Sequence, residues 1–127
     1  MRLILALSIA ALLVACDDDT EADRQYVGGQ CTVTDDCYQE GEFPQSCLTQ
    51  FKGGYCGLED CQGDVDCPEA SACVAHTDGM NYCFRVCSDK GQCNRNRDLE
   101  NESNCSSNID FVDGADGRKA CVPPSSG

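Results

Sequence analysis

Residues 61–87 read CQGDVDCPEASACVAHTDGMNYCFRVC, and this stretch holds five of the 13 cysteines in the chain. Two segments with strand-like composition, 72–76 and 82–86, lie on either side of the turn Thr77-Asp78-Gly79. The glycine suits this turn because it adopts positive φ without steric cost. The stretch therefore predicts a short β-hairpin preceded by a loop that disulfides hold in place.

The same arrangement of four cysteines occurs three times, and the first two cysteines of each set always enclose five residues. The sets are Cys31, Cys37, Cys47 and Cys56; Cys61, Cys67, Cys73 and Cys83; and Cys87, Cys93, Cys105 and Cys121. Self-similarity of this kind indicates tandem repeats. We therefore expect one disulfide-rich domain over 31–121, made of the repeats 31–56, 61–83 and 87–121.

The third repeat diverges from the other two. The second cysteine follows Asp36 and Asp66 in the first two repeats, but it follows Gln92 in the third. The fourth cysteine likewise follows Tyr55 and Tyr82, but then Ala120.

Each repeat is expected to form its own hairpin. In the first, segments 47–51 and 55–58 flank the turn Lys52-Gly53-Gly54, and in the third, 109–112 and 119–122 flank a Gly-rich turn. Large apolar residues are scattered singly, so the chain is expected to lack a large hydrophobic core and to depend on crosslinks. The predicted fold is small and disulfide-rich, with tandem short β-hairpin modules and little regular secondary structure.

Disulfide pairing within the repeats is open at this point. Four cysteines allow three connectivities, so pairing confined to single repeats still leaves about 27 patterns. We favour the first cysteine with the third and the second with the fourth, because a five-residue gap suits a loop that leaves and re-enters beside one hairpin. Pairing across repeat boundaries is the alternative.

The N-terminus has the features of an export signal. Met1-Arg2 precedes an uncharged apolar run, Leu3 to Val14, which is shorter than the roughly 20 residues that span a bilayer. The following stretch, Leu13-Val14-Ala15-Cys16, resembles the lipobox of bacterial lipoproteins. The resemblance implies cleavage before Cys16 and attachment of lipid to its thiol. The alternative is an ordinary secretory signal, for which Leu13 fits poorly at the third position before the cut.

Counting cysteines favours the lipobox interpretation. An odd cysteine in an exported protein calls for an explanation, and capping Cys16 with lipid leaves 13 minus 1, or 12, which can all pair. We expect a signal peptide over 1–15, a lipidated acidic tether over 16–30 and a tail over 122–127. Fully extended, the tether would reach roughly 50 Å.

The cysteine spacing resembles that of cysteine-rich bacterial lipoproteins and, more distantly, the Dickkopf-type cysteine-rich module of animal secreted proteins. The shared features are Cys31-x5-Cys37, Cys61-x5-Cys67-Pro68 and the Tyr-Cys pairs at Tyr55 and Tyr82. This resemblance implies a type of fold but no specific partner.

Charge and motifs limit the classes of function. Removing 1–15 removes Arg2 and no acid, which leaves a net charge of 8 minus 22, or −14, and excludes nucleic-acid binding. The chain has no Cys-x2-Cys pair for a zinc or redox site, and its one histidine, His76, is expected to be a surface residue. We expect no enzyme, no cofactor and no metal site, although weak calcium binding at Asp17–Asp19 stays open.

These observations favour a non-catalytic, lipid-anchored module of the bacterial cell envelope, facing the periplasm or the exterior. Lipid on Cys16 would attach it to the membrane, and disulfide-rigid loops would bind a protein or glycan. The alternatives are a protease inhibitor that presents Lys52 or Arg85, and a purely structural envelope component. By resemblance to enterobacterial lipoprotein sorting, Asp17 after the lipidated cysteine favours the inner membrane.

Overall fold

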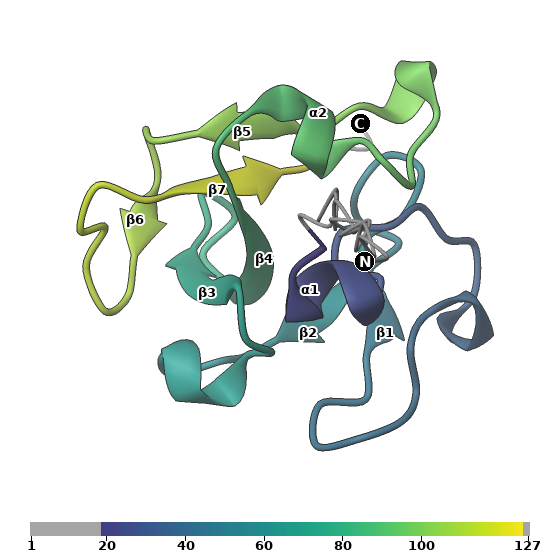
Figure 1. Cartoon of the computed structure of the whole chain (residues 1–127), viewed down its shortest axis with the longest axis horizontal. Coiled ribbons are helices and arrows are strands. Elements are labelled where there is room, and N and C mark those ends of the chain that lie inside the picture. Colours follow the sequence, from purple (N-terminus) through teal and green to yellow (C-terminus); the bar gives the residue numbers. More distant parts are fainter. Residues whose placement is uncertain (1–18, 126–127) are drawn as a thin grey trace, which may run out of the picture.

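The computed structural model describes residues 19–125 (Figure 1). Its regular elements are short: the two α-helices have four residues each, and the longest of seven strands has seven. The helices are α1 (Glu21–Arg24) and α2 (Lys90–Cys93), and the 3-10 turns are η1 (Thr34–Asp36), η2 (Asp64–Asp66) and η3 (Leu99–Asn101). The strands are β1 (Ser46–Cys47), β2 (Cys56–Glu59), β3 (Ser71–Ala75), β4 (Asn81–Cys87), β5 (Asn104–Ser106), β6 (Asp110–Phe111) and β7 (Lys119–Val122).

All seven strands belong to one antiparallel sheet organised around β4. Strand β3 pairs along one side of β4, while β2 and β7 pair with successive parts of its other side. In each repeat the third cysteine lies directly opposite the fourth across two paired strands, as in Cys73 opposite Cys83. The three repeats therefore share a local plan, and β4 joins them into a single unit.

The third hairpin predicted from the sequence is wrong in its pairing. Segment 109–112 contributes β6, which pairs with β3 rather than with β7. Strand β7 pairs instead with β5, where Cys105 lies opposite Cys121. The physical reason is the shared plan, because the third cysteine of every repeat lies on the strand that opposes the fourth. The first two hairpins form with the expected partners, β1 with β2 and β3 with β4. The outgoing strand of the first hairpin covers only Ser46–Cys47, however, and not 47–51 as expected.

Six disulfides connect the twelve cysteines of the repeats. They are Cys31–Cys47, Cys37–Cys56, Cys61–Cys73, Cys67–Cys83, Cys87–Cys105 and Cys93–Cys121. Every repeat thus pairs its first cysteine with its third and its second with its fourth, the pairing that the loop geometry favoured. Two crosslinks hold each leading loop against its own hairpin.

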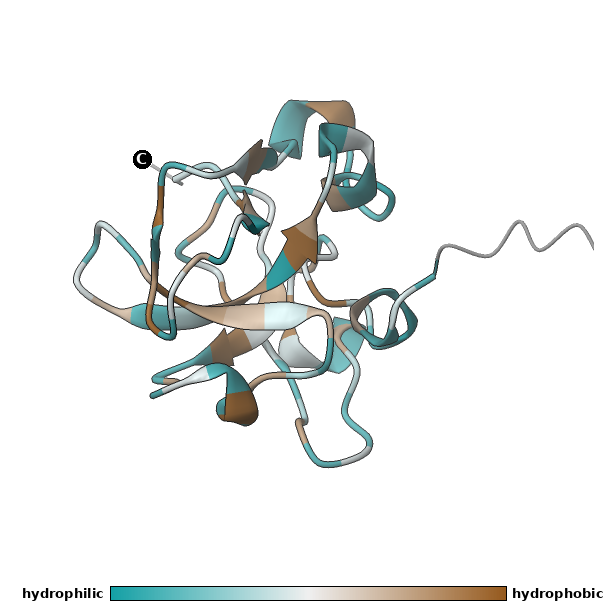
Figure 2. Ribbon diagram, turned by 60° about the vertical axis from the view of Figure 1, so that its left-hand side comes forward, coloured by the Kyte–Doolittle hydropathy of each residue, from teal (hydrophilic) through white to brown (hydrophobic). Residues whose placement is uncertain are grey.

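A small aromatic core lies where the repeats meet. Phe51, Tyr55, Tyr82 and Phe84 pack with ring centroids 5.1 to 6.1 Å apart, and all four are at most 3% exposed. Ala120, from the third repeat, is also fully buried in this cluster. Figure 2 shows apolar residues concentrated on the strands and polar residues on the loops around them. The core is small, as expected, but it is common to all three repeats.

The described part of the expected tether is folded onto the domain. Helix α1 begins at a capping box formed by Thr20 and Asp23, and both Ala22 and Val27 are buried. Gly28 N–H donates to the Cys56 carbonyl at 2.8 Å, and Cys56 N–H donates to the Gly29 carbonyl at 2.9 Å. The expectation of an extended tether is therefore wrong for residues 20–30, because this segment buries apolar side chains and satisfies its backbone against the first repeat.

The expected C-terminal tail also packs in its described part. Val122 ends β7, the Pro124 carbonyl accepts a hydrogen bond from Lys52 N–H at 2.9 Å, and Ser125 forms a bridge with Phe51. The predicted signal peptide, Cys16, and Asp17 and Asp18 of the tether lie outside the described residues. Within 19–125, no helix has the length and apolar character needed to cross a bilayer.

Candidate functional site

The five-residue loops at the start of the repeats are built on one recurring hydrogen bond. The side chain just before the second cysteine accepts from the backbone N–H just after the first cysteine. Asp36 accepts from Thr32 at 2.9 Å, and Asp66 accepts from Gln62 at 2.8 Å. In the third repeat Gln92 accepts from Ser88 at 2.7 Å. Glutamine keeps the side-chain oxygen acceptor, which explains why the third repeat tolerates this departure from aspartate.

The loops of the first two repeats each present an exposed valine. Val33 is 55% exposed and Val65 is 85% exposed, although apolar side chains of this size are usually buried. We call 31–37 the first loop and 61–67 the second loop. Two disulfides end in each loop, so the valines stand on a backbone that has little freedom to move.

The second loop is held by further contacts outside its own repeat. Asp64 N–H donates to Asp113 at 2.6 Å, and the Asp64 carboxylate contacts Arg118 at 3.0 Å. The same carboxylate accepts from Cys73 N–H at 3.0 Å. The second loop is therefore fixed to β3 and to the segment before β7, with Val65 pointing to solvent.

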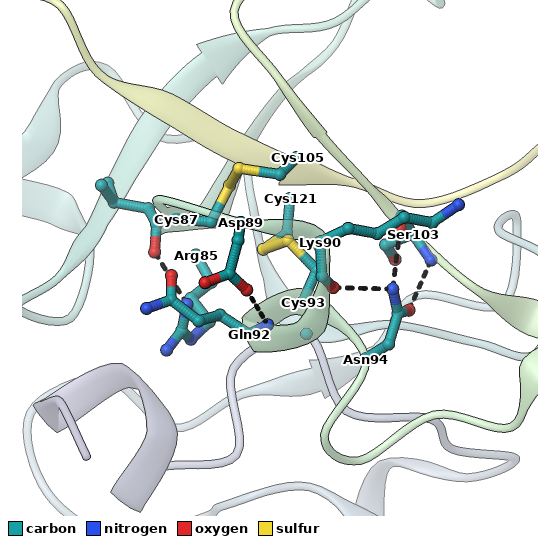
Figure 3. The surroundings of a disulfide bond; sticks show 12 residues. Arg85, Cys87, Asp89, Lys90, Gln92, Cys93, Asn94, Ser103, Cys105 and Cys121 are labelled. Carbon is teal, nitrogen blue, oxygen red and sulfur yellow. Dashed lines mark hydrogen bonds between the residues drawn. A yellow bond between two sulfur atoms is a disulfide. The ribbon is translucent and has the colours of Figure 1, made fainter. Parts of the chain in front are cut away.

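The corresponding loop of the third repeat is helical and polar. Asp89 caps α2 by accepting from Gln92 N–H at 3.0 Å, next to the Cys87–Cys105 disulfide (Figure 3). Asn94 then joins the end of α2 to Ser103 through two hydrogen bonds of 2.7 and 2.9 Å. This loop carries no exposed large apolar residue, so it lacks the feature that the first two loops share.

A cleft of about 450 Å³ lies between the N-terminal segment, the first loop and the segment after α2. Its lining residues are polar or charged for the most part: Tyr26, Gln30, Cys31, Thr32, Asp36, Arg95, Asn96, Arg97 and Asp98. Arg95 is partly exposed and forms ion pairs with Asp19 at 2.6 Å and Asp23 at 3.6 Å. We call this the first cleft.

Arg97 is a buried residue in the lining of the first cleft. Its guanidinium donates to four backbone carbonyls, those of Asn101, Gly28, Gly54 and Lys52, at 2.7 to 3.2 Å. The group also lies over the Tyr55 ring at 5.7 Å, and burial lowers its pKa. Arg97 therefore ties the N-terminal segment, the first repeat and the third repeat together, and its hydrogen-bonding capacity is largely used by the protein itself.

A second cleft, of about 280 Å³, lies between the β3–β4 turn and the loop that precedes β6. Its lining includes His76, Thr77, Ser107, Asn108 and Asp110. His76 is half-buried, and the centroid of its ring lies 5.5 Å from that of Phe51. It is therefore more enclosed than the surface residue expected from the sequence. Among the described residues, no hydrogen bond joins His76 to Ser107 or Asp110.

The two residues considered for protease inhibition differ in exposure. Arg85 is only 2% exposed and forms a buried ion pair with Asp23, so its proposed role on a contact surface is wrong. Lys52 is exposed on its turn, with its ammonium donating to the Glu100 carbonyl at 2.8 Å. Strand β4 determines this difference, because it directs Arg85 toward α1.

Each repeat contains one group of three cysteines whose sulfur atoms lie within 4.8 Å of one another. All of these sulfurs belong to disulfides, so they are not the thiolates that zinc requires. Their proximity reflects stacked pairs of crosslinks.

Comparison of the chain with protein-family models, curated proteins and solved structures found no match.

Proposed function

We propose that this protein is a lipid-anchored binding module of the bacterial cell envelope, exported and then lipidated at Cys16. It acts without catalysis, and it recognises a protein or glycan outside the cytoplasm through its disulfide-rigid loops. Six disulfides in a chain of this length are typical of proteins that mature in an extracellular or periplasmic compartment.

The pairing of the cysteines carries the lipid part of the proposal. The twelve cysteines from Cys31 to Cys121 all pair with one another, so none of them is available to Cys16. Cys16 follows Leu13-Val14-Ala15, which resembles a lipobox. A thioether to diacylglycerol accounts for the thirteenth cysteine, and an acyl chain contributes about 0.8 kcal/mol of membrane binding per buried methylene.

The second loop carries the binding part of the proposal. An exposed apolar residue such as Val65 costs solvation free energy in the isolated protein, and a partner that covers it recovers that cost. Because disulfides already restrict the loop, binding loses little conformational entropy. A rigid loop that presents an apolar residue between Asp64 and Asp66 suits a partner with a small apolar pocket and a polar or basic rim.

Mass spectrometry tests the lipid anchor. The protein is extracted from membranes of the producing bacterium, and its N-terminal peptide is analysed beside that of Cys16→Ser. We expect a peptide that begins at Cys16 and carries diacylglycerol, and release of Cys16→Ser from the membrane fraction. An unmodified Cys16 thiol in membrane-extracted protein would overturn the proposal.

Affinity capture from native membranes tests the second loop. Val65→Asp should reduce capture of the specific partner by about tenfold, the effect of losing one central apolar contact. Leu99→Asp is the matched control, because Leu99 is also 85% exposed but lies outside the loops. Equal capture by the wild type and both variants would exclude this loop as the binding surface, and inhibition of a secreted protease through Lys52 would instead favour the inhibitor alternative.

A further inference from the structure

The N-terminal segment is attached to the domain from its first described residue. Asp19 pairs with Arg95 at 2.6 Å, and the Asp19 carbonyl accepts from Arg24 at 3.1 Å. Thr20 then caps α1, with its N–H donating to Asp23 at 3.1 Å. The chain therefore joins the folded domain at residues 19 and 20.

Buried contacts hold this attachment in place. Arg85 donates to both carboxylate oxygens of Asp23, at 2.5 and 2.6 Å, and the two side chains are only 3% and 9% exposed. Ala22 is fully buried beside this pair in sequence, and Val27 is 4% exposed. Detaching α1 would leave the buried Arg85 guanidinium without its carboxylate partner and would expose Ala22 and Val27 to water. The segment therefore stays docked under native conditions.

This docking leaves a very short connection to Cys16. Two residues, Asp17 and Asp18, lie between Cys16 and Asp19. An extended chain gains at most 3.6 Å per residue, so the three steps from Cys16 to Asp19 reach about 11 Å. An unfolded 16–30 segment would reach roughly 50 Å by the same arithmetic. Lipid on Cys16 would therefore hold the α1 end of the domain against the headgroups.

Ion pairs offset part of the charge at this end. Asp19 pairs with Arg95, and Glu21 pairs with Arg24 at 3.1 Å, so these four charges cancel. Asp36 and Asp98 of the first cleft are also exposed, and Asp17 and Asp18 precede Asp19 in the chain, so the end keeps a net negative charge. Anionic lipid repels this end, so the short link to lipid on Cys16 must set the orientation.

We propose that the α1 end, defined as residues 19–24 with Arg95 and the first cleft, lies on the phospholipid surface and sets one orientation of the domain. The proposal rests on lipidation of Cys16. It fixes the domain close to the bilayer, in contrast to a module on a long flexible tether.

The orientation separates the two loops. The first loop contributes Thr32 and Asp36 to the first cleft and therefore lies on the membrane side. The second loop begins at Cys61, whose carbonyl accepts from Asn81 at 2.9 Å at the start of β4. Arg85, which contacts α1, is four residues further along β4, or about 13 Å. In this orientation the start of the second loop and the β3–β4 turn lie farther from the bilayer than the first loop does, and Val65 is accessible to a partner.

Paramagnetic relaxation measures this orientation directly. The lipidated protein, labelled with ¹⁵N, is placed in bicelles of phosphatidylethanolamine and phosphatidylglycerol that contain a gadolinium-chelating lipid. We expect loss of amide signals for residues 19–24 and 95–98, with signals retained for 62–66 and 77–79. Equal loss at both ends, or loss at 62–66 and 77–79 first, would overturn the proposed orientation.

Two control proteins make the result specific. A variant with twelve Gly and Ser residues inserted between Asp18 and Asp19 gains a flexible spacer of about 19 Å, so the selective loss at 19–24 should disappear. Soluble Cys16→Ser should keep all signals. The mass of the N-terminal peptide is measured on the same sample, so absence of lipid overturns the proposed function, whereas a lipidated protein with the wrong pattern overturns the orientation alone.

Discussion

Asp23 and Arg85 are 62 residues apart in the sequence and form a bidentate ion pair that is nearly closed to solvent. The pair joins α1 to β4, the strand around which the sheet is organised. It explains why a segment that reads as a charged tether is instead part of the folded domain.

Replacing Asp23 by Asn should destabilise the protein strongly. The amide cannot neutralise Arg85, and a buried charge left without its partner typically costs about 3–5 kcal/mol. Asp19→Asn is the matched control: its pair with Arg95 is half exposed, and we expect a loss below about 1 kcal/mol. Chemical denaturation gives both free energies of unfolding, and equal small losses would mean that the buried pair contributes no more than a surface pair.

The Asp23–Arg85 pair makes the free energy of unfolding depend on pH in the acidic range. Burial raises the pKa of Asp23, but hydrogen bonds from Arg85 and from Thr20 N–H lower it more, and the pKa lies below its ordinary value of 3.8. The stabilisation is therefore present above about pH 4 and is lost as pH falls through the folded pKa. Unfolding curves from pH 6 down to pH 2 should show this decline in the wild type, and Asp23→Asn should lack that component.

Removing one buried hydroxyl should also be costly. Tyr55 is fully buried, its hydroxyl donates to the Cys121 carbonyl, and it accepts from Arg85 N–H, both at 3.2 Å. Tyr55→Phe leaves both backbone groups without this partner, so we expect a loss of about 1–3 kcal/mol. In Tyr38→Phe, the control, the hydroxyl makes no hydrogen bond to any described residue, and we expect little change in the thermal midpoint.

Alkaline titration offers a second measurement on Tyr55. Burial raises its pKa from 10.0 to about 12. A raised folded pKa means that the stabilisation is complete below pH 10 and is lost as pH rises toward 12. Burial and the hydrogen bond to Asp78 raise the pKa of Tyr82 as well. Absorbance should therefore report tyrosinates that form late in the wild type, and the late component should lose the contribution of one tyrosine in Tyr55→Phe.

The sequence predicts the parts of this fold that are determined locally. Glycine turns and cysteine spacing predict the β1–β2 and β3–β4 hairpins, and the five-residue gap favours the observed pairing. The cysteine register could also have located the third hairpin, because Cys105 corresponds to Cys47 and Cys73. The apolar run Ile109 to Val112 points to a strand opposite 119–122, but that strand is β5, which holds Cys105.

Contacts between distant segments account for the remaining errors. Nothing near Asp23 in the sequence indicates that Arg85 would reach it, and Ala22 and Val27 are too few to mark a buried helix face. The role of Arg97 cannot be predicted from the sequence for the same reason. Its partners are backbone carbonyls of three separate segments, and every residue type has a backbone carbonyl. The only local signal was the charge of Arg97 itself, within a polar stretch that reads as a loop.

The recurring loop bond predicts a graded effect of substitutions at Asp66. Asp66→Asn keeps an oxygen that can accept from Gln62 N–H, as Gln92 does for Ser88, and should leave stability nearly unchanged. Asp66→Ala removes the acceptor and should cost about 1 kcal/mol, as loss of an exposed side-chain cap does. Thermal unfolding of the two variants tests this, and an equal loss in both would mean that the carboxylate charge, rather than the acceptor, matters.

Digestion of the unreduced protein with trypsin, under denaturing conditions with thiols blocked, tests the disulfide pairing. Cleavage after Arg85, Lys90, Arg95, Arg97, Arg118 and Lys119 places each cysteine of the third repeat on its own peptide. The structure predicts that peptide 86–90 is linked to 98–118 through Cys87–Cys105, and that 91–95 is linked to 120–127 through Cys93–Cys121. Links from 86–90 to 91–95 or to 120–127 would contradict the third repeat.

The same digest tests whether the third repeat is a closed unit, separate from the first two. Cleavage after Lys52 separates Cys31, Cys37 and Cys47 from Cys56, so the first repeat should appear as peptides 25–52 and 53–85 joined by Cys37–Cys56. No linked species should combine a residue before 86 with one after it, because every disulfide of the structure lies within one repeat. A link across Arg85 would show that the cysteines are shared between repeats, and the common plan of loop and hairpin would then fail. Linked peptides confined to one side of Arg85 would instead mean that the third repeat is joined to the first two only by the sheet, the aromatic core and the buried arginines.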